Sequence, residues 1–312
     1  MKKIASIVLA GLMAMSLFAG CSSEVTPTDS SSAAESSSSQ TESKEESSTA
    51  GSEDPYANLS GTLTLNGSTS MTAVCNALGE AFMAKYDGVT VEKANTGSGS
   101  AVTAVNDGTA LIGDLSRKVK DEEDPDGKFT KATIALDGIA IAVNPENTVD
   151  ALTSEQIEKI FAGEITNWSE VGGSDAAITV IGREEGSGTR DGFESIFGFG
   201  DDKKCAYAAE VQETGIVVSK VAADPTAIGY VSLASVSDEI KAVSVDGVAA
   251  TEENVSNGTY VVQRPFVEIF TKGTDSELVK AWFDFLKSDE GQQIIAEQKL
   301  VTVDIDANTE NK

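Results

Sequence analysis

The segment 177–197 reads AITVIGREEGSGTRDGFESIF. Its first six residues are mostly apolar or β-branched, which is typical of a buried strand. Its last residues place Phe193 and Phe197 on one face of a helix. Between the two lies a turn of glycine, serine and threonine that is flanked by Arg183 and Arg190. A strand that passes through a short turn into a helix is the unit from which α/β proteins are built.

The same alternation runs through the rest of the chain from about residue 58. Strand-like runs are 61–67, 89–94, 109–113 and 132–143, and helix-like runs are 71–86, 100–108, 152–164 and 276–288. Thr153 followed by Gln156 forms a capping box at the start of one helix. The alternation predicts an α/β fold with a mainly parallel sheet. Because it occurs in two runs, before and after residue 145, we expect two lobes.

Four segments place Ser, Thr or Gly between a strand and a helix. They are 66–70 (NGSTS), 95–101 (NTGSGSA), 113–118 (GDLSRK) and 183–191 (REEGSGTRD). Backbone N–H groups at a helix N-terminus lack partners, and glycine lets a ligand approach them. Such turns bind anions, and arginine adds charge-assisted hydrogen bonds. Each turn alone is also explained as an ordinary helix cap.

Composition excludes several classes of function. The net charge of −27 argues against a nucleic-acid partner, and the absence of histidine removes histidine-based catalysis and metal sites. The segment EEGSGTR lacks the lysine and the spacing of a nucleotide P-loop. No G-x-S-x-G motif is present, so a serine hydrolase is disfavoured. We therefore expect no cofactor and no metal.

The first 57 residues have the pattern of an export and anchoring segment. Basic residues at 2 and 3 precede an apolar run, 4–20, that is too short for a membrane span. Ala19 and Gly20 before Cys21 look like a bacterial lipobox, with an ordinary signal peptide as the alternative. We expect 1–20 to be a lipoprotein signal peptide, Cys21 to carry the lipid (palmitate), and 21–57 to be a disordered Ser/Glu-rich tether.

Two cysteines remain after the anchor. We interpret Cys75 and Cys205 as buried free thiols, with a disulfide between them as the alternative.

Motifs along the folded part closely resemble those of the phosphate-binding lipoproteins of bacterial phosphate ABC transporters. The motifs, in order, are NGSTS, TGSGSA, LSRKVK, ALDGIAIAVNPEN, LTSEQIEKIFAGEITNWSEVGG, REEGSGTRDGFE, AIGYVSL and SDEGQQII. The resemblance spans roughly residues 60 to 300. It implies a two-lobed periplasmic-binding-protein fold of type II, with the ligand in a cleft that closes by a hinge. Lobe one is then expected at 58–140 and 262–312, and lobe two at 141–261.

The resemblance also implies the residues that bind phosphate. The ligand-binding set carried over to this sequence is Thr69, Ser70, Ser98, Arg117, Arg183, Ser187, Gly188 and Thr189. Glu185 takes the place of a carboxylate that orients the arginine, and Arg190 is a supporting residue characteristic of this branch. Arg117 stands where the best-known branch has an aspartate that accepts the proton of phosphate. We therefore hypothesise that Asp137 supplies this acceptor, the alternative being a simple turn residue.

The function implied is the capture of inorganic phosphate on the outer face of the cell membrane and its delivery to an ABC transporter permease. The protein is not expected to be an enzyme. A receptor for another tetrahedral oxyanion, such as sulfate or molybdate, is the first alternative. A secreted phosphohydrolase and a surface adhesion module are weaker ones, because a nucleophile–base pair is not evident and only the tether favours adhesion.

Overall fold

The computed structural model describes residues 54–310. The predicted signal peptide, the lipid site at Cys21 and nearly all of the predicted tether lie outside the described residues. Within residues 54–310, no helix is long and apolar enough to cross a membrane.

The fold is α/β, as predicted, and its strands form one large sheet. Eleven of the described strands belong to this sheet, whose main path runs β2-β1-β3-β11-β4-β8-β6-β7. The strands are β1 (Ser60–Gly67), β2 (Gly88–Asn95), β3 (Ile112–Leu115), β4 (Phe129–Val143), β5 (Ala151–Leu152), β6 (Thr179–Arg183), β7 (Ala209–Val211), β8 (Ala227–Ser232), β9 (Lys241–Ala242), β10 (Ser244–Val245), β11 (Gln263–Thr271), β12 (Val301–Thr302) and β13 (Thr309–Glu310).

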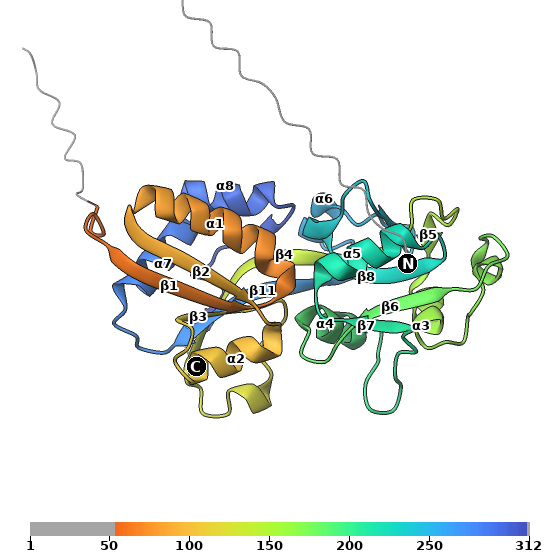
Figure 1. The fold of residues 1–312 in the computed structure, drawn as a ribbon, viewed down its shortest axis with the longest axis horizontal. Helices are drawn as coiled ribbons and strands as arrows, with labels where there is room; N and C mark the ends of the chain where they lie inside the picture. Colours follow the sequence, from red (N-terminus) through yellow and green to blue (C-terminus); the bar gives the residue numbers. More distant parts are fainter. Residues whose placement is uncertain (1–53, 311–312) are drawn as a thin grey trace, which may run out of the picture. The chain divides into compact units, whose positions relative to one another are not determined.

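The sheet is mixed, whereas the sequence predicted a mainly parallel one. Pairs such as β1–β2 and β6–β8 are parallel, but β11 is antiparallel to both β3 and β4. The long strand β4 pairs with β11 along its first part and with β8 from Ile139 onward. It therefore passes through both halves of the molecule, and with β11 it forms the connection between them (Figure 1).

Helices cover both faces of the sheet. The helices are α1 (Thr72–Lys85), α2 (Ser98–Asn106), α3 (Ser154–Phe161), α4 (Gly188–Ile196), α5 (Thr214–Ala223), α6 (Glu252–Ser256), α7 (Glu277–Lys287) and α8 (Asp289–Glu297). Figure 1 shows α1 and α8 on one side of the first half and α2 on the other. The predicted capping box of α3 is formed, because Thr153 Oγ1 accepts from Gln156 N and Gln156 Oε1 accepts from Thr153 N.

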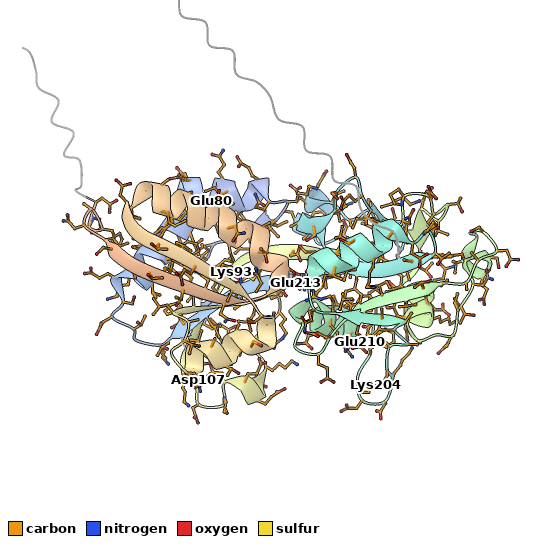
Figure 2. All side chains as sticks on the ribbon, viewed as in Figure 1. Glu80, Lys93, Asp107, Lys204, Glu210 and Glu213 are labelled. Carbon is orange, nitrogen blue, oxygen red and sulfur yellow. The ribbon has the colours of Figure 1, made fainter. Side chains whose placement is uncertain are left out.

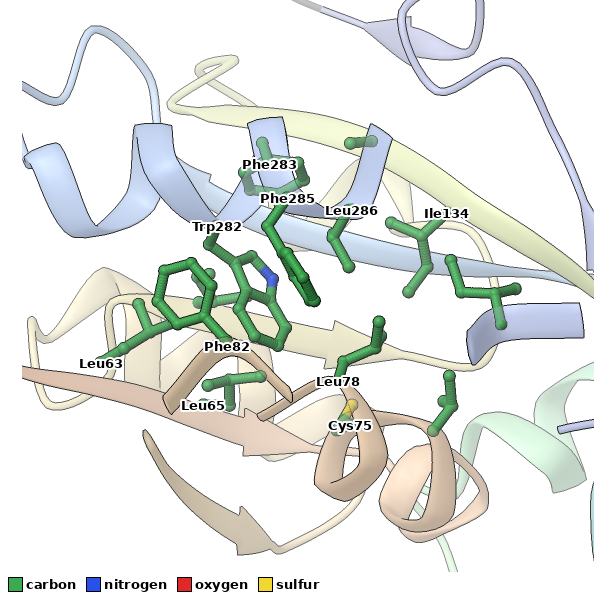
Figure 3. Packing of buried hydrophobic residues seen from close by; sticks show 14 of the residues in the cluster. Leu63, Leu65, Cys75, Leu78, Phe82, Ile134, Trp282, Phe283, Phe285 and Leu286 are labelled. Atoms are coloured by element: carbon green, nitrogen blue, oxygen red, sulfur yellow. The ribbon is translucent and has the colours of Figure 1, made fainter. Parts of the chain in front are cut away.

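Two large apolar cores lie on either side of the connection. The first core takes its buried residues from 59–135 and 266–305; Phe82 and Trp282 meet edge to face in it, with ring centroids 5.3 Å apart (Figure 3). The second core lies within 139–262, where Phe193 stacks on Tyr230 at 4.2 Å. We call the parts around these cores lobe one and lobe two. The boundaries at residues 140 and 262 stay predictions.

Both described cysteines are free thiols. Cys75 is buried in the first core beside Leu78, and Cys205 is half-buried against the second (Figure 3). The interpretation as free thiols is confirmed, although Cys205 is only partly covered.

Candidate functional site

The predicted anion-binding turns all lie where a strand gives way to a helix or loop. Strand β1 leads through the short 3-10 helix Thr69–Met71 into α1, β2 leads into α2 at Ser98, and β6 leads into α4 at Gly188. The third turn, after β3, is followed by an extended loop and not by the predicted helix. Charged side chains cover the outer surface, and Glu213, just before α5, lies near the boundary between the halves (Figure 2).

The turns of the two lobes meet through hydroxyl groups and through one backbone hydrogen bond. Ser70 Oγ lies 2.7 Å from Thr189 Oγ1, which joins the first turn to the fourth. Gly99 N donates to Gly186 O at 3.0 Å, which joins the second turn to the fourth. Three of the predicted ligand-binding residues are buried at this junction, namely Ser70, Ser98 and Thr189.

Arg183 is a buried cation without an acid partner. Its side chain is 2% exposed, and no ion pair is formed by it within residues 54–310. Nε donates to Val211 O, Nη1 to Thr214 Oγ1, and Nη2 to Thr69 Oγ1. Burial lowers the pKa of Arg183 to about 10, which still leaves it charged at neutral pH.

Gly188 fits closely against lobe one. A Cβ at this position would lie 2.3 Å from Ser98 Oγ and 2.6 Å from Ser116 Oγ, so only glycine allows these hydroxyls to reach the start of α4. The preceding residue, Ser187, caps the helix by accepting from Arg190 N. The N-terminal turn of α4 is therefore enclosed by hydroxyl groups from two other turns.

Three hydroxyl residues belong to this cluster although the sequence analysis did not select them. Ser68 donates to Ser116 Oγ at 2.8 Å, and Ser116 N donates to Ser98 Oγ at 3.1 Å. Both serines lie inside quoted turns, so the signal was present. Thr214 Oγ1 lies 3.1 Å from both Ser70 Oγ and Thr69 Oγ1. It starts α5 after the three-residue strand β7, which is too short to show a pattern.

Arg117 is held by acidic residues. It forms a two-pronged ion pair with Glu123 and also meets Asp191 of α4, with Nε 2.6 Å from Oδ2. Lys120 Nζ approaches the same carboxylate at 3.2 Å. These contacts join lobe one to lobe two. They occupy the guanidinium that the resemblance assigned to the ligand.

Asp137 is fully buried and pairs with Arg264. Its Oδ2 accepts from Arg264 Nε at 3.1 Å and from Nη2 at 2.9 Å. Its Oδ1 accepts from Ser232 Oγ at 2.7 Å and from the Leu233 backbone. Burial raises the pKa of this carboxyl and the charge of Arg264 opposes the rise. Arg264 and Ser232 together donate three hydrogen bonds to the carboxylate, so Asp137 is already engaged by protein partners.

Glu185 does not contact Arg183 as the resemblance implied, whereas Arg190 contacts the turn. Glu185 is exposed and makes no ion pair with Arg183; backbone carbonyls orient Arg183 instead. Arg190 donates to Arg183 O at 2.9 Å and pairs with Glu194 and Glu210. Arg190 thus holds the backbone at the start of the turn through its hydrogen bond to Arg183 O.

A separate cluster of one cysteine and two carboxylic acids is buried in lobe one. Cys75, Asp114 and Glu268 could in principle hold a metal, since their ligand atoms lie within 4.8 Å of one another. Lys93 Nζ already lies 2.8 Å from Asp114 Oδ2 and supplies a positive charge there. An ion would have to displace this pair inside an apolar core, so the donor set does not fit a metal.

Comparisons with known proteins show the family to which the chain belongs. The family model for the PBP superfamily domain matches residues 32–290. The phosphate-binding protein PstS of Bacillus subtilis is 33% identical over 248 residues, which are 78% of this chain and 81% of that protein.

Solved structures of phosphate-transport proteins also match the chain. A candidate phosphate ABC transporter substrate-binding protein from Clostridium perfringens, solved with bound phosphate, is 40% identical with a TM-score of 0.75; the match covers 78% of this chain and 100% of that one. An ABC-type phosphate transport receptor from Vibrio cholerae is 32% identical with a TM-score of 0.66, over 77% of this chain and 100% of that one. The protein therefore belongs to the PBP superfamily and, within it, to the family of PstS phosphate-binding proteins.

Proposed function

We propose that this protein captures inorganic phosphate between its two lobes and delivers it to the permease of a phosphate ABC transporter. The observation that carries the proposal is Arg183, a buried cation in the strand that leads into α4, for which residues 54–310 supply no acid partner. An unpaired buried charge is costly, and proteins keep one where a ligand of opposite charge compensates it. Relatives whose names state phosphate binding support the choice of anion.

The surrounding groups suit a tetrahedral oxyanion. Backbone N–H groups at the starts of α2 and α4 point outward, and the helix dipoles add positive potential there. Hydroxyl groups of Thr69, Ser70 and Ser98 can donate or accept, so they can serve both charged and protonated ligand oxygens. We assign Thr69, Ser70, Ser98, Arg183 and the turn 187–189 to direct ligand contact.

We further propose different roles for two of the predicted residues. Arg117 acts as the lobe-one half of an inter-lobe ion pair with Asp191, and Asp137 acts by holding Arg264. In both cases the side chain is already engaged by charged protein partners.

The protein acts outside the cytoplasm, as expected of a transporter's substrate-binding protein, and we propose that a lipid on Cys21 anchors it to the cell membrane. The signal-like segment 1–20 supports this anchor. The homologues are transport proteins and not enzymes, and the hydroxyl cluster has no histidine to activate it as a nucleophile.

Titration calorimetry on the full-length protein in detergent, freed of bound ligand, tests the proposal. We expect one phosphate per chain in the wild type and at least a 100-fold loss of affinity in Arg183→Gln. Lys159→Gln, on the exposed surface of lobe two, serves as the control and should bind like the wild type. Absence of phosphate binding by the wild type, or tighter binding of sulfate, would contradict the proposal.

A further inference from the structure

Arg264 has a hydrogen-bonding group that the protein does not satisfy. The residue lies on β11, directly opposite Asp137 on β4, and is 4% exposed. Its Nε and Nη2 bind the Asp137 carboxylate, but Nη1 is buried and has no hydrogen-bond partner in the structure. Buried donors without a partner are rare in folded proteins, and each such group calls for an explanation.

The side chain of Arg264 packs against α4, the helix that follows the anion-binding turn. A Cβ at Gly192 would lie 3.3 Å from Arg264 Cδ, so the arginine stem packs against α4 at this glycine. Gly192 follows Gly188 by four residues, which is about 6 Å along a helix axis. The side chain of Arg264 therefore meets α4 about one helical turn after the residue that starts the helix.

Electrostatics give a second, independent indication that Arg264 is near the site. The charge of Arg264 contributes, after burial, to the lowered pKa of Arg183. Two arginines therefore lie close enough to repel each other at the junction of the lobes.

We propose that Arg264 is a further ligand-contacting residue, which donates its free Nη1 hydrogens to the bound oxyanion, and that Asp137 positions it. This inference rests on the proposed function. Arg264 sits where β4 and β11 connect the lobes, so a ligand bonded to it is also tied to the hinge. Asp137 then keeps the guanidinium in one orientation, because it accepts from both Nε and Nη2 while Ser232 holds its other oxygen.

The experiment compares Arg264→Gln, Asp137→Asn and the double variant by phosphate and sulfate titration of the full-length protein. Breaking one half of a buried pair endangers folding, whereas the double variant leaves no charge unpaired. The control is Asp124→Asn with Lys131→Gln, which neutralises another pair, 2.8 Å apart, in lobe one. Melting temperatures without ligand are recorded for every variant.

We expect the double variant to bind phosphate about 10- to 100-fold more weakly, the usual effect of losing a hydrogen bond to a charged group. It should be no weaker than Arg264→Gln alone, and sulfate affinity should change by the same factor. The control should bind like the wild type. A folded double variant with wild-type affinity would overturn the inference, as would a phosphate-to-sulfate ratio that changes in Asp137→Asn alone.

A crystal structure of the wild type with phosphate gives a measurement that does not depend on folding of the variants. Nη1 should lie about 2.7–2.9 Å from a phosphate oxygen. Nη1 bonded only to water or protein would overturn the inference. Failure of the wild type to bind phosphate at all is a different result, which removes the proposed function itself.

Discussion

Neutralising either Arg117 or Asp191 should weaken phosphate binding by loosening the closed form. The two side chains belong to different lobes, and Nε lies 2.6 Å from Oδ2. Arg117 is almost fully buried, while the Asp191 side chain is 24% exposed. In an open form the two charges would separate and be solvated. The ion pair therefore stabilises the closed form alone.

The magnitude follows from distance and exposure. Two unit charges 4 Å apart interact by about 4 kcal/mol at an effective dielectric constant of 20. Desolvation and the exposed side of Asp191 remove much of this, and Glu123 still holds Arg117 when Asp191 is changed. We expect about 1 to 2 kcal/mol, which is about a 5- to 30-fold increase in Kd. Because only the closed form is affected, most of the change should appear in the dissociation rate.

The assay is a double-mutant cycle in which Kd and the dissociation rate of phosphate are measured. Arg117→Gln and Asp191→Asn should have similar effects, and the double variant should be little weaker than either. Lys120→Gln is the control, since Lys120 is 3.2 Å from Asp191 but 43% exposed, and should change Kd less than about twofold. A loss above 100-fold in Arg117→Gln, with Asp191→Asn unchanged and the effects additive, would refute the reasoning and return Arg117 to the ligand.

Three further changes test other parts of the structure. Thr214→Val should weaken phosphate binding about tenfold in calorimetry, since its hydroxyl joins Arg183 to Ser70, and Thr214→Ser should restore it. Gly188→Ala should abolish measurable binding while the melting temperature falls little, since the added Cβ displaces Ser98. Burial raises the pKa of Glu268 well above 4.5, so the folded state retains a proton that the unfolded chain loses, and stability falls as pH rises from about 4.5. Glu268→Gln should therefore raise the melting temperature at pH 8 and leave it nearly unchanged at pH 4; an equal change at both would contradict this.

Local pattern was enough to predict three of the four strand–turn–helix units, whereas the expectation of a common cleft came from the family resemblance. Strand β6, the turn 184–187 and helix α4 follow one another directly in the sequence, so each part is determined by near neighbours. The mixed sheet could not be predicted in this way. The antiparallel pairing of β4 with β11 joins residues more than 120 positions apart, as for Asp137 and Arg264, and depends on how the two lobes pack.

The environments of the charged residues were the least predictable part of the site. Glu123 lies six residues after Arg117, a spacing that brings side chains together neither in a helix nor in a strand, so this pairing depends on the loop between them. The contact with Asp191 and the pair Asp137–Arg264 needed the fold. A resemblance transfers the position of a residue in a motif, but the partners of that residue come from other segments. For this reason the role of Arg117 in binding the ligand stays a prediction from the resemblance, and its contacts with Glu123 and Asp191 are the ground for the different role that we propose.

A count of charges at the junction shows how a chain with net charge −27 can bind an anion. Arg264 and Asp137 cancel, and Arg117 and Lys120 cancel Glu123 and Asp191, so Arg183 leaves one positive charge. The N-termini of α1, α2 and α4 add roughly half a charge each. Together they give a local positive excess of about +2.5, which Glu184 and Glu213 reduce because they also act on Arg183. The Debye length is about 8 Å at physiological salt, so the surface acids act weakly on an anion bound at the junction. The binding of the anion therefore depends mainly on the charges and helix dipoles beside it.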